Sequence, residues 1–470
     1  MAWASGGRPR MNVRGAGSIW GQRSLQATTG TVRNRDQHLR AMPLLRAPIE
    51  RYSGLSRPKE ALAVAPVRWE LPKWSSMRVL IIIGFALFCC LPSRASTITA
   101  ATCSQTDVQA AINSASNGDT VRTPGPCTAS WSNVTITGSV GITLDGGGNT
   151  TITSAAALSI RSTATTSTRV TGFIFTNGGN SNNGDVTTSG SKTGATFRID
   201  HNTFTNANPT VIACWNNAPG LIDHNTFIGG GASEMIHNMA MGATDASGWG
   251  DDIVPGGPNM LFVEDNTFTN SVSNGGFLGT SAIQSYNGAR TVFRHNTLTN
   301  AQIDQHGTAG MIGARWWEIY ENTFVVANGV AQDKYMDIRA GGGVVFNNHK
   351  TGQASPAAII FREEDTGYPA LYQVGRGINQ DYSPAFVWGN DSIMPVASNS
   401  SNVTQGVDFI VSVSQPPLLV RCELSVDSGV AGGLIGTCAT SFSYTPFTYP
   451  HPLQGASSVA APTGLAAVIH

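Results

Sequence analysis

Charged side chains are scarce in this chain, making up 12% of its 470 residues, and aromatic residues account for 8%. This scarcity argues against long surface helices stabilised by ion pairs. The spacings typical of zinc sites, phosphate-binding loops and nucleophile elbows are also missing. By contrast, 53 glycines and many Ser, Thr and Asn residues suit short strands joined by turns. The composition therefore predicts an all-β protein with one large or two ordinary domains.

Long apolar runs are lacking as well. The run from Val79 to Leu91 is shorter than the roughly 20 residues that a membrane-spanning helix needs. It follows Met77-Arg78 and precedes small residues ending at Ala95, an arrangement typical of a secretory signal peptide. We therefore expect a signal peptide over 77–95 and a secreted or periplasmic protein, with no stable membrane insertion after cleavage. A buried core helix is the alternative interpretation.

The two parts of the chain on either side of this run differ in charge. Residues 1–76 carry 13 basic and 4 acidic side chains, whereas residues 96–470 carry 14 basic and 25 acidic ones. The basic segment has no helical or strand periodicity, so we expect it to be disordered or to precede the true start at Met77. A nucleic-acid-binding arm is the alternative, but we expect no nucleic-acid partner. Residues 454–470, rich in Gly, Ala, Ser and Pro, predict a flexible tail.

Only seven cysteines are present, and two of them lie in the predicted signal peptide. Two pairs each bracket a short element, and export would place them in an oxidising compartment. The pattern predicts the disulfides Cys103–Cys127 and Cys422–Cys438. Cys214 is then left over, and we expect it to be a small buried side chain.

A short helix is expected at the start of the exported part. Ser104 or Thr106 can cap a helix that places Val108 and Ile112 on one face. Gly118-Asp119 then ends it, and short β-rich segments follow.

The strongest pattern is a repeated phrase ending in Asn-Thr-Phe or a close variant. Its asparagines recur at Asn202, Asn225, Asn266, Asn296, Asn322 and Asn348. The shortest interval, from Asn202 to Asn225, suits one winding of a solenoid with three short strands, and the longer intervals indicate inserted loops. Asn tolerates the left-handed backbone conformation, and its amide can bond both to the backbone and to the next Asn. These residues therefore predict a stacked turn ladder rather than glycosylation sites.

About residues 98–453 resemble a known family. The resemblance is carried by the Cys103 helix with Gln109-Ala-Ala-Ile-Asn113, the turn Leu144-Asp-Gly-Gly-Gly148, the Asn-Thr-Phe repeats and the closing segment Tyr444–Leu453. These features resemble the secreted right-handed β-helix proteins of the pectate-lyase-like superfamily, in a largely uncharacterised bacterial subgroup. The resemblance implies a right-handed parallel β-helix over 96–453 with a short N-terminal cap helix. We expect a monomer whose partner is a polysaccharide.

Stacked strands form flat faces that suit extended sugar chains, so we expect function to lie on one face. The richest polar stretch runs from Ile283 through Asp304-Gln-His-Gly307 to Glu318. Arg290, Arg315 and Arg339 follow one another at intervals close to one winding, which predicts an arginine ladder for an anionic sugar. Guanidinium groups also lower the pKa of the proton next to a uronate carboxylate, as β-elimination requires.

His306, Lys334, Tyr335 or an arginine of the ladder could remove that proton, and His306 is the base that we expect. Together with the three arginines it forms the predicted catalytic set. Adjacent residues on a strand point in opposite directions, so one of Trp316 and Trp317 belongs to the core. The predicted substrate-binding residues are Trp249, Trp316, Glu318, Lys334 and Tyr335.

Two acidic groups support other functions. Asp251 and Asp252 lie in the longest insertion of the repeat, where they could act in inverting glycoside hydrolysis or bind calcium. The run Glu363-Glu364-Asp365 is a second possible calcium site. The sequence thus predicts binding of an anionic polysaccharide, with β-elimination, glycoside hydrolysis and a non-catalytic adhesive or structural role left open. Ca²⁺ is the cofactor that these groups would hold.

Overall fold

The computed structural model describes residues 95–455 with internal gaps at 139, 163–166, 177–183, 190–195, 206–209, 230–233, 241–253, 271–280, 308–312, 327–333, 353–357, 364–373, 377–381 and 422–439. The basic segment 1–76 and nearly all of the predicted signal peptide 77–95 therefore lie outside the described residues. In the described part, no helix is long and apolar enough to cross a membrane.

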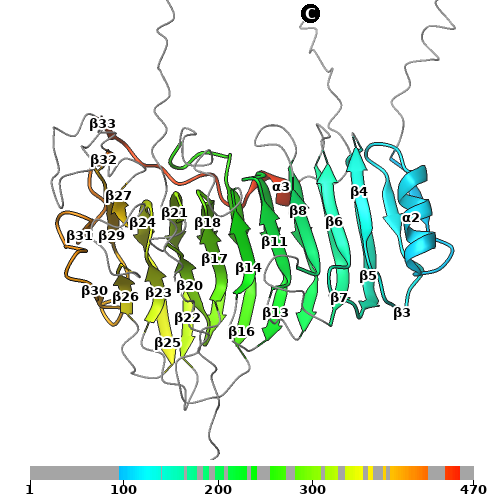
Figure 1. Cartoon of the computed structure of the whole chain (residues 1–470), viewed down its shortest axis with the longest axis horizontal. Helices are drawn as coiled ribbons and strands as arrows, with labels where there is room; N and C mark the ends of the chain where they lie inside the picture. Colours follow the sequence, from blue (N-terminus) through cyan, green and yellow to red (C-terminus); the bar gives the residue numbers. More distant parts are fainter. Residues whose placement is uncertain are drawn as a thin grey trace, which may run out of the picture. The chain divides into compact units, whose positions relative to one another are not determined.

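Most of the described strands belong to three stacks of short parallel strands (Figure 1). The first stack contains β1 (Thr97–Thr99), β2 (Thr120–Arg122), β5 (Thr143–Ile152), β7 (Thr168–Phe175), β9 (Phe197–Asp200), β12 (Gly220–Asp223), β15 (Leu261–Glu264), β18 (Arg290–Arg294), β21 (Trp316–Tyr320), β24 (Gly342–Phe346), β29 (Ala385–Trp388) and β31 (Phe409–Ser412). The second stack contains β3 (Cys127–Ala129), β10 (Thr203–Thr205), β13 (Thr226–Gly229), β16 (Thr267–Asn270), β19 (Thr297–Thr299), β22 (Thr323–Val326) and β25 (His349–Gly352). These two stacks join through the long strands β5 and β7.

The third stack is a separate ten-stranded sheet. Its strands are β4 (Val134–Gly138), β6 (Leu158–Ser162), β8 (Val186–Ser189), β11 (Ile212–Trp215), β14 (Glu234–Met239), β17 (Ser281–Tyr286), β20 (Gln302–Gln305), β23 (Lys334–Ile338), β26 (Ala358–Phe361) and β30 (Val396–Ser398). Two antiparallel pairs complete the strands, namely β27 (Gly375–Arg376) with β28 (Tyr382–Ser383) and β32 (Leu419–Arg421) with β33 (Thr440–Phe442).

From β9 to β26, each winding of the chain, which we call a coil, contributes one strand to each stack. In the coil that begins at β12, the chain turns at Asn225 into β13 and then crosses to β14 in the ten-stranded sheet. Partners one coil later are in parallel register, as Phe227 with Phe268 and His237 with Gln284. The right-handed parallel β-helix predicted from the sequence is confirmed.

Alternation along the strands fills the interior with apolar side chains. On the second stack, Phe175, Phe204, Phe227 and Phe268 are fully buried. Their rings stack from one coil to the next with centroid separations of 5.0, 5.0 and 4.6 Å. The Phe of the repeated phrase is therefore a core residue.

The asparagines of the repeat stack at the turn between the first and second stacks. Each Oδ1 accepts hydrogen bonds from the backbone N–H and the side-chain amide of the Asn one coil earlier, as Asn225 does for Asn202 at 3.0 and 3.1 Å. The same contacts continue through Asn266, Asn296, Asn322 and Asn348 to Asn390. Because each of the six asparagines before Asn390 is buried, the ladder satisfies backbone groups that water cannot reach.

One detail of the turn differs from the expectation. The left-handed residue is the one before the Asn, with φ between 51° and 58° at His201, His224, Asp265, His295, Glu321 and Asn347. The Asn itself follows this residue and supplies the hydrogen bonds. The residue that precedes each ladder Asn therefore points its side chain away from the core, where a polar side chain is tolerated.

Helix α2 (Gln105–Ser114) lies at the N-terminal end of the β-helix (Figure 1). The Ser104 hydroxyl caps it by accepting the backbone N–H of Asp107 at 3.3 Å, and Val108 and Ile112 are buried. The structure does not show the predicted disulfide beside it, since Cys103 and Cys127 are both free thiols. Burial and the neighbouring Cys127 thiol raise the pKa of Cys103 to about 11. The two thiols thus lie close together without a covalent bond.

The other predicted cysteine positions have separate outcomes. Cys214 is buried in the core, as expected, and burial raises the pKa of its thiol to about 12. Cys422 and Cys438 lie outside the described residues.

Residues 443–455, which we call the C-terminal strap, run back along the outer face of the first stack and end in α3 (Pro452–Gly455; red in Figure 1). Tyr444 packs beside Phe346 and Trp388, and Phe447 beside Phe262. The strap thereby covers a second apolar cluster, outside the main core.

Candidate functional site on the ten-stranded sheet

The outer face of the ten-stranded sheet carries a polar cluster between β14 and β26. Because successive side chains alternate, Ile283 and Ser285 point inward while Gln284 and Tyr286 point outward. The register aligns four outward polar residues from consecutive coils, namely His237, Gln284, Asp304 and Asp337.

A second outward line runs beside it. Backbone hydrogen bonds extend the register past the strand ends, from His306 N to Ser285 O at 3.0 Å, from Arg339 N to Gln305 O at 2.9 Å, and from Arg362 N to Ile338 O at 3.0 Å. Tyr286, His306, Arg339 and Arg362 are therefore neighbours along the helix axis. In the other direction the same line continues through Trp215 to Ser189.

Asp304 is at the centre of the cluster. Its carboxylate accepts Arg339 Nε at 3.1 Å and Gln284 Nε2 at 2.7 Å, and it also binds Arg339 Nη2. Gln284 Nε2 is 3.0 Å from His306 Nδ1, and Arg339 Nη2 contacts the same ring nitrogen. Asp304 and Arg339 are almost fully buried, whereas the His306 side chain is 13% exposed.

Asp337 forms a second ionic group one coil further along. It accepts Arg362 Nε at 2.7 Å and Nη2 at 2.9 Å, and it also pairs with Lys334. Burial alone would raise the pKa of Asp337, but the two cations outweigh burial and lower it. This carboxylate is therefore ionised and fully engaged at neutral pH.

Tyr286 lies between two histidine rings from the coils before and after it. Its ring centroid is 4.9 Å from that of His237 and 4.3 Å from that of His306. Burial, followed by the charges of Glu234 and Asp304, raises the pKa of Tyr286 well above its usual value. The phenol therefore keeps its proton and is a donor.

The protonation of His306 follows from its partners. Arginine has only donors, so Nδ1 of His306 accepts from Arg339, and the neutral ring carries its proton on Nε2. In this tautomer Nε2 donates a hydrogen bond and has no lone pair to take a proton. This arrangement favours a donor role for His306 over the predicted role of base.

The predicted arginine ladder does not form. The register pairs Arg290 with Trp316, and Trp316 in turn with Gly342. Arg315 and Arg339 both precede these aligned positions, so neither is in register with Arg290. Arg290 begins β18, Arg315 precedes β21, and of the three only Arg339 reaches the ten-stranded sheet.

Trp316 and Glu318 also lie away from this site. Both are buried under the C-terminal strap, where Glu318 accepts Trp316 Nε1 at 3.0 Å and the Tyr444 hydroxyl at 2.8 Å. Burial raises the pKa of Glu318 despite these donors. Trp317 belongs to the core, as the alternation predicts for one of the pair. Neither Trp316 nor Glu318 is open to a sugar.

The remaining predicted residues lie in the core, in the outer cluster or outside the described residues. Tyr335 points into the core, where burial raises its pKa to about 12. Lys334 joins the outer cluster through Asp337. Trp249, Asp251, Asp252, Glu364 and Asp365 lie outside the described residues.

The expected calcium sites are therefore only partly visible. Glu363 accepts Asn402 Nδ2 at 2.7 Å. In the described part of the chain, no group of three His, Cys, Asp or Glu side chains could hold a metal ion. Ca²⁺ binding stays a prediction.

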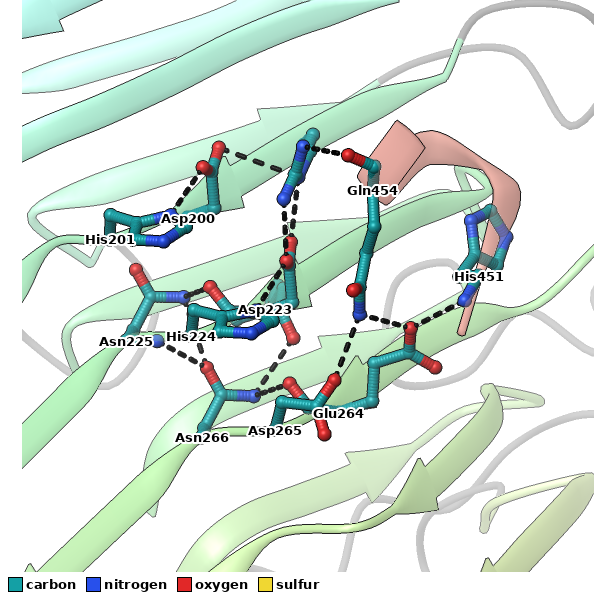
Figure 2. A network of polar contacts seen from close by, with 12 residues as sticks. Asp200, His201, Asp223, His224, Asn225, Glu264, Asp265, Asn266, His451 and Gln454 are labelled. Carbon is teal, nitrogen blue, oxygen red and sulfur yellow. Dashed lines mark hydrogen bonds and ion pairs between the residues drawn. The ribbon is translucent and has the colours of Figure 1, made fainter. Parts of the chain in front are cut away.

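The network on the opposite face involves the strap (Figure 2). Arg198 binds Asp223 at 2.7 and 2.9 Å and donates to the backbone oxygens of Leu453 and Gln454. Glu264 accepts the His451 backbone N–H and Gln454 Nε2, both at 2.8 Å. These charges hold the strap in place, which assigns this face a structural role.

Sequence reasoning singled out the stretch that contains Gln284, Tyr286, Asp304 and His306, but it missed Glu234 and His237. These two lie on β14, within the longest repeat interval, and no repeated motif marks them. Their position one coil from Tyr286 became evident only from the strand register.

No protein-family model and no curated protein sequence matches the chain. Among solved structures, an alginate lyase from Paenibacillus sp. strain FPU-7 is similar, with 14% identity and a TM-score of 0.32 over 68% of this chain and 95% of that chain. A mutant of a PL6 family alginate lyase gives 14% identity and a TM-score of 0.31 over 68% of this chain and 49% of that chain. These similarities concern the parallel β-helix fold alone.

Proposed function

We propose that the outer face of the ten-stranded sheet binds an extended anionic polysaccharide and cleaves it by β-elimination. The observation that carries this proposal is the meeting of His306, Arg339 and Tyr286 in one cluster. Such a protein would act outside the cytoplasm, in keeping with the signal peptide expected over 77–95.

The layout of the outer face supports binding of a sugar chain. Outward positions repeat at about 4.8 Å from coil to coil, a distance comparable to the length of one sugar unit. Trp215 and Tyr286 offer aromatic surface along this line, with Arg362 at one end and the exposed Arg161 toward the other. Aromatic rings suit sugar faces, and guanidinium groups suit uronate carboxylates.

The cluster also supports the chemistry. In β-elimination a base takes the proton next to the carboxylate, and the bond to the glycosidic oxygen breaks as a double bond forms. Arg339 and the Nε2–H of His306 would stabilise the negative charge that develops on the carboxylate. Tyr286, which stays protonated, would donate its proton to the departing oxygen.

Glycoside hydrolysis has less support among the described residues. Asp304 and Asp337 are partners on adjacent coils, but both are bound by arginine. A general acid needs a raised pKa, whereas that of Asp337 is lowered. Hydrolysis at Asp251 and Asp252 remains a separate proposal.

Binding without cleavage is the second candidate. Arg339 and Arg362 are each paired with a carboxylate, which limits the charge they can offer to a substrate. A face that only holds a polymer, without cleaving it, would need no arginine charge beyond what these paired arginines offer.

The test uses the purified protein with pectin, alginate and other uronate polymers, with and without added calcium. We expect unsaturated products that absorb in the ultraviolet. His306→Ala should reduce the rate on the order of 100-fold, the loss typical of one stabilising donor. The control His349→Ala removes a mostly exposed imidazole on β25 and should leave the rate unchanged. Absence of product from every polymer contradicts β-elimination, and retention of a polymer without turnover would favour the binding-only function.

A further inference from the structure

His237 lies on the outer face of β14, one coil before Tyr286, and its ring is held by a buried carboxylate. Its Nδ1 is 2.8 Å from Oε1 of Glu234, three residues earlier on the same strand. The Glu234 side chain is 8% exposed and the His237 side chain 7%. This pair is a buried carboxylate–histidine dyad that directly borders the cluster described above.

The carboxylate determines which nitrogen of His237 carries the proton. An ionised carboxylate only accepts, so Nδ1 of His237 must donate to Glu234. In the neutral ring, Nε2 then has a lone pair able to take a proton, as in other histidine bases oriented by a carboxylate.

This Nε2 atom has no hydrogen-bond partner among the described residues, although it is buried. A buried polar atom without a partner is uncommon and calls for an explanation, of which a catalytic role is one. Since its ring is 4.9 Å from that of Tyr286, the lone pair lies in the same cluster as the proposed proton donor.

We infer that His237, oriented by Glu234, is the general base of the β-elimination site, and that His306 serves only as a donor. This inference rests on the proposed function. The two rings lie on either side of Tyr286 in opposite tautomers, with a lone pair on Nε2 of His237 and a proton on Nε2 of His306. On one side of the Tyr286 ring, His237 can therefore accept a proton. On the other side, His306 can donate a hydrogen bond.

The step balances with these groups alone. Nε2 of His237 takes the proton from the carbon next to the carboxylate, and the electrons of that C–H bond form the new C=C bond. The bond from the neighbouring carbon to the glycosidic oxygen breaks, and the oxygen takes the proton of Tyr286. A net transfer of one proton through solvent, from the imidazolium to the phenolate, then restores both groups.

Glutamine substitutions at the two histidines distinguish a base from a donor. Glutamine can donate from an atom near the position of Nε2, but it cannot act as a base at neutral pH. His237→Gln should reduce the rate of product formation on the order of 10²- to 10⁴-fold, the usual contribution of a general base. His306→Gln should cost about tenfold or less, because the donor is retained. Circular dichroism and retention on a column of the same polymer verify that both variants fold and bind.

Glu234 is a positioning residue, and its variant has a different signature. Glu234→Gln should lower kcat with KM nearly unchanged, because it disturbs the tautomer of His237 without touching the sugar. Free imidazole added to His237→Ala should restore part of the rate, which a purely structural role would not allow.

The outcomes separate the two proposals. If the wild-type chain makes unsaturated product and His237→Gln keeps its rate, the base assignment is wrong and the proposed function stands. An equal, complete loss in His237→Gln and His306→Gln would also contradict the division of roles. If the wild-type chain makes no product from any uronate polymer, both proposals fail together.

Discussion

The first stack and the ten-stranded sheet belong to the same coils, yet buried polar groups on their outer faces differ in their hydrogen-bond partners. On the first stack, the fully buried Arg294 binds Glu264, the Tyr320 hydroxyl and the backbone oxygens of Phe447 and Thr448. On the ten-stranded sheet, the buried Nε2 of His237 has no partner among the described residues. The strap thus supplies partners for the buried Arg294, whereas nothing in the described part of the chain does so for Nε2 of His237.

This difference is informative because both faces carry arginine, histidine and carboxylate side chains. From residue types alone, either face could be predicted to bind a polysaccharide. The strap covers the part of the first stack from β12 to β29, including Trp316 and Glu318, so that part is closed to a sugar chain. Substitutions at Arg294, in the Asn ladder and at His451 test this structural role, in order of decreasing expected effect.

The largest effect should come from Arg294→Met, which leaves Glu264 buried without its cation. We expect a loss of about 3–5 kcal/mol in the free energy of unfolding, the cost of breaking a buried ion pair from one side. Urea denaturation measures it. The control Arg122→Met breaks a pair whose arginine side chain is 54% exposed, and should cost about 1 kcal/mol or less. Equal losses in the two variants would show that burial under the strap does not make the Arg294–Glu264 pair more important than an exposed pair on the same stack.

The Asn ladder should be nearly as sensitive. Asn266→Ala removes donors to the carbonyls of Ile222 and Glu264 and an acceptor for Asn225, so we expect a loss of about 2–4 kcal/mol. Asn390→Ala, at the half-buried end of the ladder, should cost less, because water can replace its contacts. Thermal unfolding of both variants is the measurement, and a larger loss at Asn390 would contradict the ladder argument.

The smallest effect concerns pH. Burial, followed by the charges of Arg294 and Arg198, lowers the pKa of His451 in the strap to about 4. Between about pH 6.5 and pH 4, the imidazole of His451 is therefore protonated in the unfolded state but neutral in the folded state. The free energy of unfolding should fall as the pH drops through this range, by on the order of 2 kcal/mol. His451→Asn keeps an acceptor for the Leu453 backbone N–H and should flatten this dependence. Denaturation at pH 7 and pH 4 checks it, and an unchanged slope would exclude His451 as the cause.

The fold was predictable because the repeat is local and periodic. Residues one coil apart must superimpose if Asn202, Asn225 and Asn266 occupy equivalent turns, and the register agrees. The cap helix followed from the cap at Ser104 and from its apolar spacing. Cys214 in the core followed from the absence of a pairing partner.

The errors came from features that depend on register or on distant chain segments. The coil is slightly longer than the intervals between the arginines, so Arg290 aligns with Trp316 rather than with Arg315. In a strand, a shift of one residue reverses the face on which a side chain lies. The contact of the strap with Glu318, 126 residues away at Tyr444, has no counterpart in any local pattern.

Half of the candidate site was also beyond local reasoning. His306 and Arg339 were expected together, and they are in contact. His237 and Glu234 were not, since a Glu three residues before a His is an ordinary feature of a strand. Their relevance depends on Tyr286, which lies on a different strand, one coil further along the chain.

The amino-acid sequence by itself determined the winding of this protein, because a turn residue and a core residue that recur once per coil leave a single consistent way to stack the strands. Which outer face is covered and which is left with an unpaired lone pair was decided only in the tertiary structure. The physical reason is that burial and proton positions depend on neighbours from other coils and from the strap, and the spacing along one strand does not encode those neighbours.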